Sequence, residues 1–289
     1  MIDMRVHQPE TIDEALDLLS ELGDDATVIS GGTAMVLMLK TGLIAPEAMV
    51  SLGRLSGLSG IVEDDGLLKL GALMTLRSGE MSPLVREVLP VLSDTLSKVA
   101  NVRVRNVATI GGNLAEADYA SDPPATLLAL RSSVVARSNR GERVIPLTDF
   151  FVDFYETALE PDELITEVRV PKLNSTSGAA YIKYVTRSSE DRPCVGVAAV
   201  VDLGEDNVCR SLRVVVGAVA ATPQEVEAAE NLAVGKDLDD ELIGEIAQAY
   251  SESIDPIDDL RGSKWYRRKV IGVFVKRTIQ EAIAVRSAT

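Results

Sequence analysis

Histidine and cysteine are scarce in this sequence. Its 289 residues include a single histidine, His7, and two cysteines, Cys194 and Cys209. One histidine excludes motifs that need two, such as the zinc-protease helix, and leaves a serine–histidine hydrolase with one badly placed candidate. The two cysteines, in what we expect to be adjacent strands, do not suggest a disulfide scaffold or an iron–sulfur ligand set. We therefore expect neither a metal site nor a cluster in this chain.

Basic residues are also in the minority. The chain has 29 Lys and Arg against 44 Asp and Glu, a formal net charge of -15. Nucleic-acid binding needs clustered Lys and Arg, whereas here they are scattered as far as the C-terminal tract. No window approaches the roughly 18 uninterrupted apolar residues of a membrane span, and residues 1–10 lack the basic patch and apolar stretch of a signal peptide. We expect a cytoplasmic protein with no nucleic-acid partner and no membrane span.

The first half of the chain mixes helices, strands and glycine-rich turns. A capping-box pattern at residues 11–14 predicts an amphipathic helix that ends at Gly23. Helical periodicity over residues 84–100 predicts one longer helix. The stretch 105–124, rich in Gly, Asn, Asp and Pro, predicts a long functional loop. Short strands are expected at residues 26–30, 49–52 and 67–71.

The second half predicts a run of strands followed by a run of helices. A hairpin is expected at 134–137 and 143–146, and a strand at 164–170. Beyond a polar boundary at 174–178 we expect three antiparallel strands at 179–187, 195–203 and 211–219, with a turn at 204–207. Helices should follow at 222–234, 239–253 and 263–285. This order indicates an α+β protein and not a doubly wound sheet.

Two glycine pairs are the strongest candidates for a binding site. The first, Ile29-Ser30-Gly31-Gly32-Thr33-Ala34, lies between a predicted strand and a predicted helix. Paired glycines let backbone N–H groups approach a phosphate closely, and a threonine hydroxyl adds a donor near the helix N-terminus. The alternative is an ordinary turn. Since the sequence has neither a Walker A pattern nor the glycine fingerprint of the dinucleotide fold, any nucleotide would need another architecture.

The second pair, Thr109-Ile110-Gly111-Gly112-Asn113-Leu114, repeats this arrangement of a hydroxyl, two glycines and a polar side chain. Downstream, Asp118 and Asp122 add carboxylates that can accept hydrogen bonds from ribose hydroxyls, held by Pro123 and Pro124 in a rigid turn. An acidic surface turn is the alternative for these carboxylates. Two such loops in one chain favour a nucleotide over two ordinary turns.

The second loop, followed by Ser121-Asp122 and Pro124, resembles the signature of the FAD-binding subunits and domains of xanthine dehydrogenase, aldehyde oxidoreductase and carbon monoxide dehydrogenase. Residues 29–33 are similar to the first flavin loop of this molybdenum hydroxylase family. The resemblance continues through residues 164–168 and 181–183 to the C-terminal 260–268. It implies a two-subdomain FAD-binding fold, of the kind shared with vanillyl-alcohol oxidase, at residues 1–54 and 55–173. A C-terminal domain at 174–289, with three antiparallel strands and a helical layer, completes it.

The resemblance also implies which residues hold a noncovalent FAD. Both loops match those around the diphosphate, Ser121 and Asp122 match the ribose and phosphate side, and Ile165 matches an apolar adenine contact. Lys183 matches a residue that reaches the cofactor from the third domain, the alternative being a solvated lysine on an edge strand. The candidate cofactor contacts are Ile29, Ser30, Gly31, Gly32, Thr33, Ala34, Ala108, Thr109, Gly111, Gly112, Asn113, Ala117, Asp118, Ser121, Asp122, Ile165 and Lys183.

Two departures from the family pattern lie close to the expected flavin ring. Tyr119 stands where the family often has proline, and Arg192-Pro193-Cys194 replaces smaller, more apolar residues. These changes leave open how the protein tunes the flavin.

The function implied by the resemblance is an electron relay. A large molybdenum-cofactor subunit would oxidise the substrate, a small subunit would carry [2Fe-2S] clusters, and this chain would pass the electrons to an external acceptor. The complex would be a dimer of heterotrimers. One alternative is a stand-alone flavin oxidase with a covalent flavin, for which Cys194 is the candidate linkage site. A second is a sensor or assembly module that kept the fold and lost the flavin.

Overall fold

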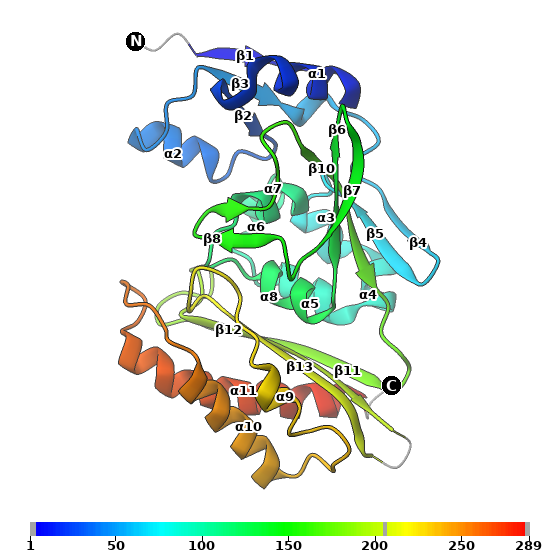
Figure 1. Ribbon diagram of the computed structural model, residues 1–289, viewed down its shortest axis with the longest axis vertical. Helices are drawn as coiled ribbons and strands as arrows, with labels where there is room; N and C mark the ends of the chain where they lie inside the picture. The colour runs from blue at the N-terminus through cyan, green and yellow to red at the C-terminus, as the bar shows by residue number, and fades with distance from the viewer. Residues whose placement is uncertain (1–3, 205–206, 287–289) are drawn as a thin grey trace.

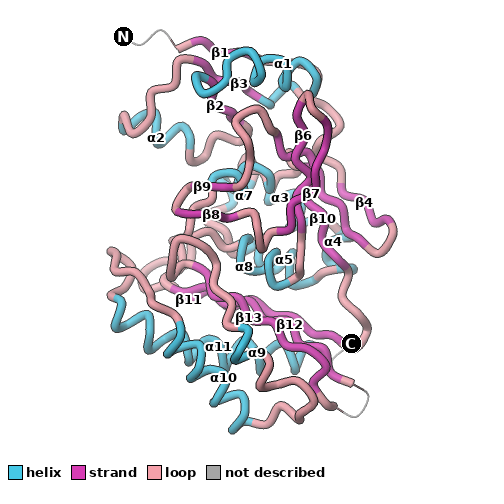
Figure 2. The backbone as a smooth tube through the Cα atoms, viewed as in Figure 1, coloured by secondary structure: helices cyan, strands magenta, loops and turns pink. Residues whose placement is uncertain are grey.

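The computed structural model describes residues 4–204 and 207–286, which form three sheets arranged one after another along the long axis (Figure 1). A small two-stranded sheet, β8 (Phe151–Asp153) with β9 (Glu156–Thr157), lies beside the middle of the molecule (Figure 2). The α+β class expected from the sequence is confirmed. Each of the three larger sheets lies within one of the three segments expected to be domains, and the boundaries themselves stay a prediction.

The first sheet is parallel, in the order β1-β3-β2. Its α1 helix begins as expected, because the Thr11 hydroxyl accepts the Glu14 N–H at 3.2 Å. The Glu14 carboxylate returns to the N–H of Glu10, at 2.8 Å, and not to that of Thr11. The elements of this part are β1 (Arg5–His7), α1 (Ile12–Leu22), η1 (Gly23–Asp25), β2 (Ala26–Ile29), α2 (Met35–Thr41), β3 (Ala48–Ser51) and η2 (Leu52–Arg54).

The second sheet is antiparallel, in the order β4-β5-β10-β6-β7, and the predicted hairpin is confirmed as β6 with β7. Its strands are β4 (Ile61–Asp64), β5 (Leu67–Gly71), β6 (Ser133–Ser138), β7 (Gly141–Pro146) and β10 (Leu164–Pro171). The chain between β5 and β6 forms α3 (Leu76–Met81), α4 (Pro83–Val88), α5 (Pro90–Ser97), α6 (Val102–Arg105), α7 (Ile110–Glu116) and α8 (Pro123–Ala129). One hydrophobic core holds these helices and strands together.

The third sheet is antiparallel, as predicted, and is shared between two cores. Ala198 and Val200 of β12 pack into the core that contains α5 and α8, while Val197 and Ala199 pack into the core that contains α10 and α11. Because side chains alternate across a strand, a sheet apolar on both faces joins what lies on either side. The elements are β11 (Ser177–Tyr184), β12 (Val195–Leu203), β13 (Cys209–Gly217), α9 (Glu227–Glu230), α10 (Asp240–Ser253) and α11 (Lys264–Arg286).

Three sequence-based predictions about elements are wrong. The single helix expected at 84–100 is two helices, α4 and α5, because Pro90 has no N–H to donate and keeps Leu89 out of the helical region, at φ -142° and ψ 71°. The loop expected at 105–124 contains α7 and the start of α8. Of the helix expected at 222–234, only α9 (Glu227–Glu230) is helical, because the backbone of Gln224 pairs with that of Val216 in a β-bridge.

Strands β1, β4, β8 and β9 were not expected from the sequence. They are short, between two and four residues, and β4, β8 and β9 are largely exposed, so no apolar alternation marks them. The turn expected at 204–207 includes residues 205–206, which lie outside the described residues. Across residues 4–204 and 207–286, no helix is long and apolar enough to cross a membrane.

Candidate functional site

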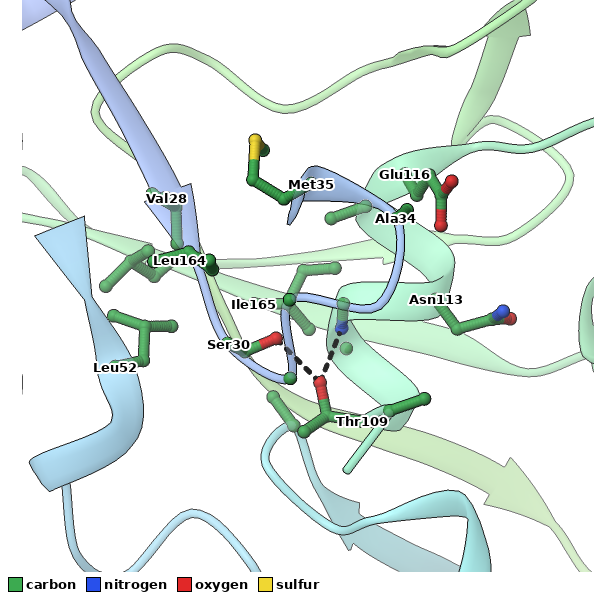
Figure 3. Close-up of a pocket in the computed structure, with 18 of the residues that line it drawn as sticks. Val28, Ser30, Ala34, Met35, Leu52, Thr109, Asn113, Glu116, Leu164 and Ile165 are labelled. Atoms are coloured by element: carbon green, nitrogen blue, oxygen red, sulfur yellow. Dashed lines mark hydrogen bonds between the residues drawn. The ribbon is translucent and has the colours of Figure 1, made fainter. Parts of the chain in front are cut away.

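The two glycine loops come together between the first and second sheets. Gly31 lies so close to the second loop that a Cβ built on it would be 2.0 Å from the Val107 carbonyl oxygen. The Ser30 and Thr109 hydroxyls share a hydrogen bond of 2.9 Å, which Figure 3 shows crossing from one loop to the other. Only a residue without a side chain at position 31 permits this approach. The loops, 79 residues apart in the sequence, therefore form one structure.

The first loop offers unused backbone donors. Gly32 has φ +69°, in the left-handed region that favours glycine, and its carbonyl accepts the Val36 N–H at the start of α2. Within the part of the chain that the structure describes, the N–H groups of Gly31, Gly32 and Thr33 have no hydrogen-bond acceptor. Consecutive free N–H groups in such a turn make an anion-binding concavity. This matches the phosphate-binding role expected of the first loop.

The second loop is built differently from the expectation. Thr109 caps α7, so Gly111 and Gly112 belong to the first turn of a helix. The Gly111 N–H donates to the Ala72 carbonyl at 2.8 Å, and the Gly112 N–H donates to the Thr109 hydroxyl at 3.1 Å. A Cβ on Gly112 would lie 2.6 Å from the Ser30 Oγ. These glycines therefore allow close packing, and the donors that the loop can offer a ligand are side chains.

The loops enclose a pocket of about 410 Å³, within the usual range for ligand sites. Its floor is apolar, with Val28, Leu52, Leu164 and Ile165 on one side in Figure 3. Its polar residues are hydroxyls, Asn113 and the carboxyls Glu116, Glu160 and Glu163; no Lys, Arg or His is among the lining residues that the structure describes. An anion bound here would depend on backbone N–H groups and hydroxyls for its partners.

The last turn of α7 carries an isolated carboxyl. Glu116 lines the pocket, and its Oε1 is buried without a hydrogen-bond partner among the described residues. Burial raises the pKa of Glu116 to about 7, the negative charge of Asp118 adds to this rise, and the Arg192 guanidinium opposes it. Asp118 itself pairs with Arg192 at 2.6 Å. Glu116 therefore changes its charge near neutral pH, inside the pocket.

Most of the predicted cofactor contacts line this pocket. They are Ile29, Ser30, Gly31, Gly32, Thr33, Ala34, Ala108, Thr109, Gly111, Gly112, Asn113 and Ile165. The other predicted contacts, Ala117, Asp118, Ser121, Asp122 and Lys183, are not among the lining residues. Ala117 ends α7 with φ +47°. The Ser121 hydroxyl and the Asn113 side-chain amide exchange hydrogen bonds of 2.8 and 3.1 Å, so Ser121 orients a residue of the pocket.

Asp122 and Lys183 bind each other at the boundary between the second and third sheets. Their ion pair, 2.9 Å long, is buried, with side chains 4% and 5% exposed. The other Asp122 oxygen accepts a hydrogen bond of 2.6 Å from the Tyr181 hydroxyl. Lys183 also donates to the Lys98 carbonyl at 2.7 Å, so it is not a solvated lysine on an edge strand. In this structure both Asp122 oxygens have protein partners, and its contact with a cofactor stays a prediction.

A second cavity, of about 560 Å³, is lined by the chain before α8, the connection between β11 and β12, and the chain before α11. Tyr119, Arg187, Arg192, Asp259 and Arg261 are among its lining residues. The Tyr119 hydroxyl donates to Asp259 at 2.9 Å and accepts from Arg261 at 2.9 Å. Of the residues singled out as departures, Tyr119 and Arg192 line this cavity, while Pro193 and Cys194 do not. Through Asp118, Arg192 also reaches the carboxyl cluster beside the first pocket.

Cys194, the candidate for a covalent flavin, lines neither of these two cavities. It is fully buried, and its Sγ would be 2.7 Å from a Cβ built on Gly262. Burial also raises the pKa of its thiol. This environment is unlike that of a reactive cysteine.

Several pocket residues were missed by the sequence analysis. Glu116 lies three residues after Asn113, so both point to the same side of α7, as Figure 3 shows. Reading Thr109 as a helix N-cap would have predicted this, since threonine is a favoured capping residue. Tyr155 and Leu52 come from a hairpin and a 3₁₀ turn, and no local pattern connects them to the loops.

This architecture, a strand–glycine turn–helix unit facing a capped helix across an apolar pocket, defines a nucleotide-cofactor-binding protein. Comparison with known families agrees. Residues 2–173 match the family model described as the FAD binding domain in molybdopterin dehydrogenase, and residues 180–282 match the C-terminal domain of the CO dehydrogenase flavoprotein. The chain therefore belongs to the family of FAD-binding flavoproteins of molybdopterin dehydrogenases, a family of oxidoreductases.

Relatives and solved structures cover nearly the whole chain. It is 36% identical to 6-hydroxypseudooxynicotine dehydrogenase complex subunit alpha of Paenarthrobacter nicotinovorans, over 95% of this chain and 92% of the relative. It is 32% identical to the carbon monoxide dehydrogenase medium chain of Hydrogenophaga pseudoflava, over 96% of each. The solved carbon monoxide dehydrogenase from that organism superposes with a TM-score of 0.94, at 33% identity and 97% coverage of both chains.

The residues of the pocket fit FAD. The free N–H groups of the first loop suit a diphosphate, and the glycines at positions 31, 111 and 112 allow the close packing that holds this loop at the pocket. The apolar floor formed by Leu52, Leu164 and Ile165 suits a planar base. The expected binding of FAD is thus consistent with the donors, the shape and the family.

Proposed function

We propose that this chain is the FAD-binding electron-transfer subunit of a heteromeric molybdenum hydroxylase. It accepts electrons from the [2Fe-2S] clusters of a partner subunit and passes them to an external acceptor. The observation that carries the proposal is the pocket between the two glycine loops, which has free backbone donors and an apolar side, in a chain of the FAD-binding family. Across residues 4–204 and 207–286, no group of three or more His, Cys, Asp or Glu is arranged to hold a metal ion.

In this proposal the protein binds and positions the cofactor, and the cofactor supplies the redox chemistry, accepting electrons singly and releasing them in pairs. Gly31, Gly32 and Thr33 present N–H groups to the diphosphate. Asn113, held by Ser121, and the hydroxyls of Ser30 and Thr109 add polar contacts. The apolar floor of the pocket, which includes Leu164, excludes water from the planar base of the cofactor.

The partners follow from the relatives, which are named as medium or FAD subunits of dehydrogenases, among them nicotine 6-hydroxylase and carbon monoxide dehydrogenase. We propose a large molybdenum-cofactor subunit and a small [2Fe-2S] subunit, assembled as a dimer of heterotrimers. A location in the cytoplasm stays a prediction. The substrate belongs to the molybdenum subunit, and these relatives act on several chemical classes.

The stand-alone oxidase is the second candidate function. The buried environment of Cys194, outside both described cavities, argues against a covalent flavin at that residue. A flavin released completely by acid precipitation supports the relay, whereas yellow precipitated protein supports the oxidase.

The test is purification of the tagged chain from its host, followed by identification of the chains that accompany it. We expect a large molybdenum-containing chain and a small iron–sulfur chain. The assembled complex should oxidise its substrate, and the FAD-loaded chain alone should oxidise no purine, aldehyde, N-heterocycle or carbon monoxide. Robust substrate turnover by the lone chain would overturn the proposal in favour of the oxidase.

A further inference from the structure

The pocket between the glycine loops has an unusual balance of charge. A diphosphate brings negative charge, yet the described lining residues include three carboxyls and no basic side chain. Glu163 is neutralised by Arg143, which contacts both of its oxygens at 2.7 Å. Glu116 has no such partner, because the nearby Arg192 pairs with Asp118. Of the two lining carboxyls without a basic partner among the described residues, Glu160 is exposed to solvent, whereas Glu116 has a buried oxygen.

Charged and titratable groups from several segments of the chain lie near Glu116. Asp118 follows it after the end of α7, Tyr155 comes from the β8–β9 turn, and Arg192 comes from the chain before β12. Glu160 and Glu163 lie in the same pocket, on the chain before β10. Asp118 and Arg192, which form an ion pair with each other, act in opposite directions on Glu116, and the effect of Asp118 is the larger.

We propose that FAD binding at this pocket is coupled to uptake of a proton by Glu116, so that the neutral carboxyl is the form that accommodates the cofactor. This inference rests on the proposed function and adds a residue to it. In the free protein the buried Oε1 lacks a hydrogen-bond partner among the described residues. A neutral carboxyl can donate a hydrogen bond as well as accept one, and it does not repel a second anion in the same pocket.

The geometry supports the coupling on two grounds. Figure 3 shows the Glu116 carboxyl on the same side of α7 as Asn113, and both residues line the pocket together with Ala34 of the first loop. A diphosphate bound by the loops and an ionised Glu116 would therefore be two negative charges in one pocket, where they repel each other. Burial raises the pKa of Glu116 to about 7 before any cofactor is present. An added diphosphate raises it further, which is the condition for proton uptake.

The experiment is calorimetric titration of the apoprotein with FAD between about pH 6 and about pH 8, in two buffers that differ in ionisation enthalpy. If one proton is taken up, the dissociation constant should rise by roughly tenfold over this range, since a single coupled site changes affinity by at most tenfold per pH unit. The heat of binding should also differ between the two buffers. This part needs no variant.

The variant Glu116→Gln tests whether Glu116 is the group that takes up the proton, because glutamine has the shape of the neutral carboxyl and does not titrate. We expect its FAD affinity to be nearly independent of pH and, at about pH 8, equal to or tighter than that of the unmodified protein. Glu87→Gln, an exposed position on α4, is the matched control and should keep the pH dependence. Loss of the pH dependence in Glu116→Gln, together with its persistence in Glu87→Gln, would assign the proton uptake to Glu116.

Two results would overturn the inference while leaving the proposed function intact. One is an FAD affinity that changes less than about twofold over the pH range in the unmodified protein. The other is a pH dependence that persists in Glu116→Gln. Absence of FAD binding to the unmodified protein at every pH would instead overturn the proposed function, and this inference with it.

Discussion

The two glycine pairs have the same appearance in the sequence and different roles in the structure. At Gly31 and Gly32 the chain turns between β2 and α2, and three successive N–H groups have no acceptor among the described residues. At Gly111 and Gly112 the chain is already helical, and both N–H groups are bonded within the protein. The first loop offers backbone donors to a ligand, while the second is a support that the first loop packs against.

This difference shows that a glycine pair has at least three separate uses. Gly31 and Gly111 leave out a Cβ that would meet backbone atoms, at 2.0 and 2.9 Å respectively. Gly32 adopts a positive φ. Gly112 leaves room for the hydrogen bond between Ser30 and Thr109. Variants that isolate each use can therefore separate loss of stability from loss of FAD.

The largest effect on stability should come from a site outside the loops. Asp122→Ala leaves the Lys183 ammonium buried without its charge partner, which typically costs about 3–5 kcal/mol of unfolding free energy. Chemical denaturation measures this loss, and the double variant Asp122→Asn with Lys183→Met should recover part of it. If Asp122 only holds the second and third sheets together through Lys183, the folded variant should keep its FAD affinity. A large loss of affinity in the folded protein would restore the direct ribose contact predicted from the sequence.

Gly31→Ala should lower both stability and FAD occupancy, because the added methyl would force the two loops apart. Overpacking of this kind costs about 1–3 kcal/mol. Gly60→Ala is the matched control, since a Cβ at Gly60 meets nothing within 4 Å. Thermal unfolding and flavin content are the measurements. Equal behaviour of the two variants would contradict the close approach of the loops.

Gly32→Ala tests the positive φ by itself. An alanine in the left-handed region costs about 1–2 kcal/mol, and the nearest atom to its Cβ is the flexible end of Ile29, at 3.2 Å. Gly42 also has φ +69° but ends α2, and it does not line the pocket. We expect Gly32→Ala and Gly42→Ala to lose similar stability, and only Gly32→Ala to weaken FAD binding. Equal FAD affinities would show that the loop's N–H groups do not face the cofactor.

The smallest effect is expected for Thr109→Val, which removes a helix cap and the hydrogen bond to Ser30. Loss of a threonine cap costs about 1 kcal/mol. Thr11→Val removes the corresponding cap of α1, outside the pocket, and should cost a similar amount. A drop in FAD affinity specific to Thr109→Val would support its place in the site, and identical affinities would remove its hydroxyl from the list of cofactor contacts.

The sequence predicted those parts of the fold that local patterns encode. The three strands of the third sheet have long apolar runs, and α1 has a capping residue, so both were found. The break at Leu89 was missed although Pro90 encodes it, because helical periodicity continues on both sides. The loops were predicted as candidate sites from their glycines. The helix that starts in the second loop is encoded by the Thr109 cap, a local signal that we did not use, whereas its packing against Ala72 depends on contacts distant in the sequence.

For Asp122 and Lys183, residue type alone could not distinguish a contact with the cofactor from an ion pair within the protein. A carboxylate and a lysine near a cofactor loop suit a ligand as well as each other, and only the packing of β11 against the helices of the second sheet brings them within 2.9 Å. Glu116 illustrates the converse. Its position in the pocket follows from helical spacing, but the other residues around it, such as Tyr155 of the β8–β9 turn, come from distant parts of the sequence.

The central claim, that FAD is held noncovalently between the two glycine loops, is tested most directly by equilibrium titration of the apoprotein with FAD. The unmodified protein should bind one FAD per chain and release it on acid precipitation. The double variant Gly32→Val with Gly112→Val, verified as folded by circular dichroism, should bind no FAD, because it carries branched side chains at both loops. Full FAD retention by that folded variant would contradict the account.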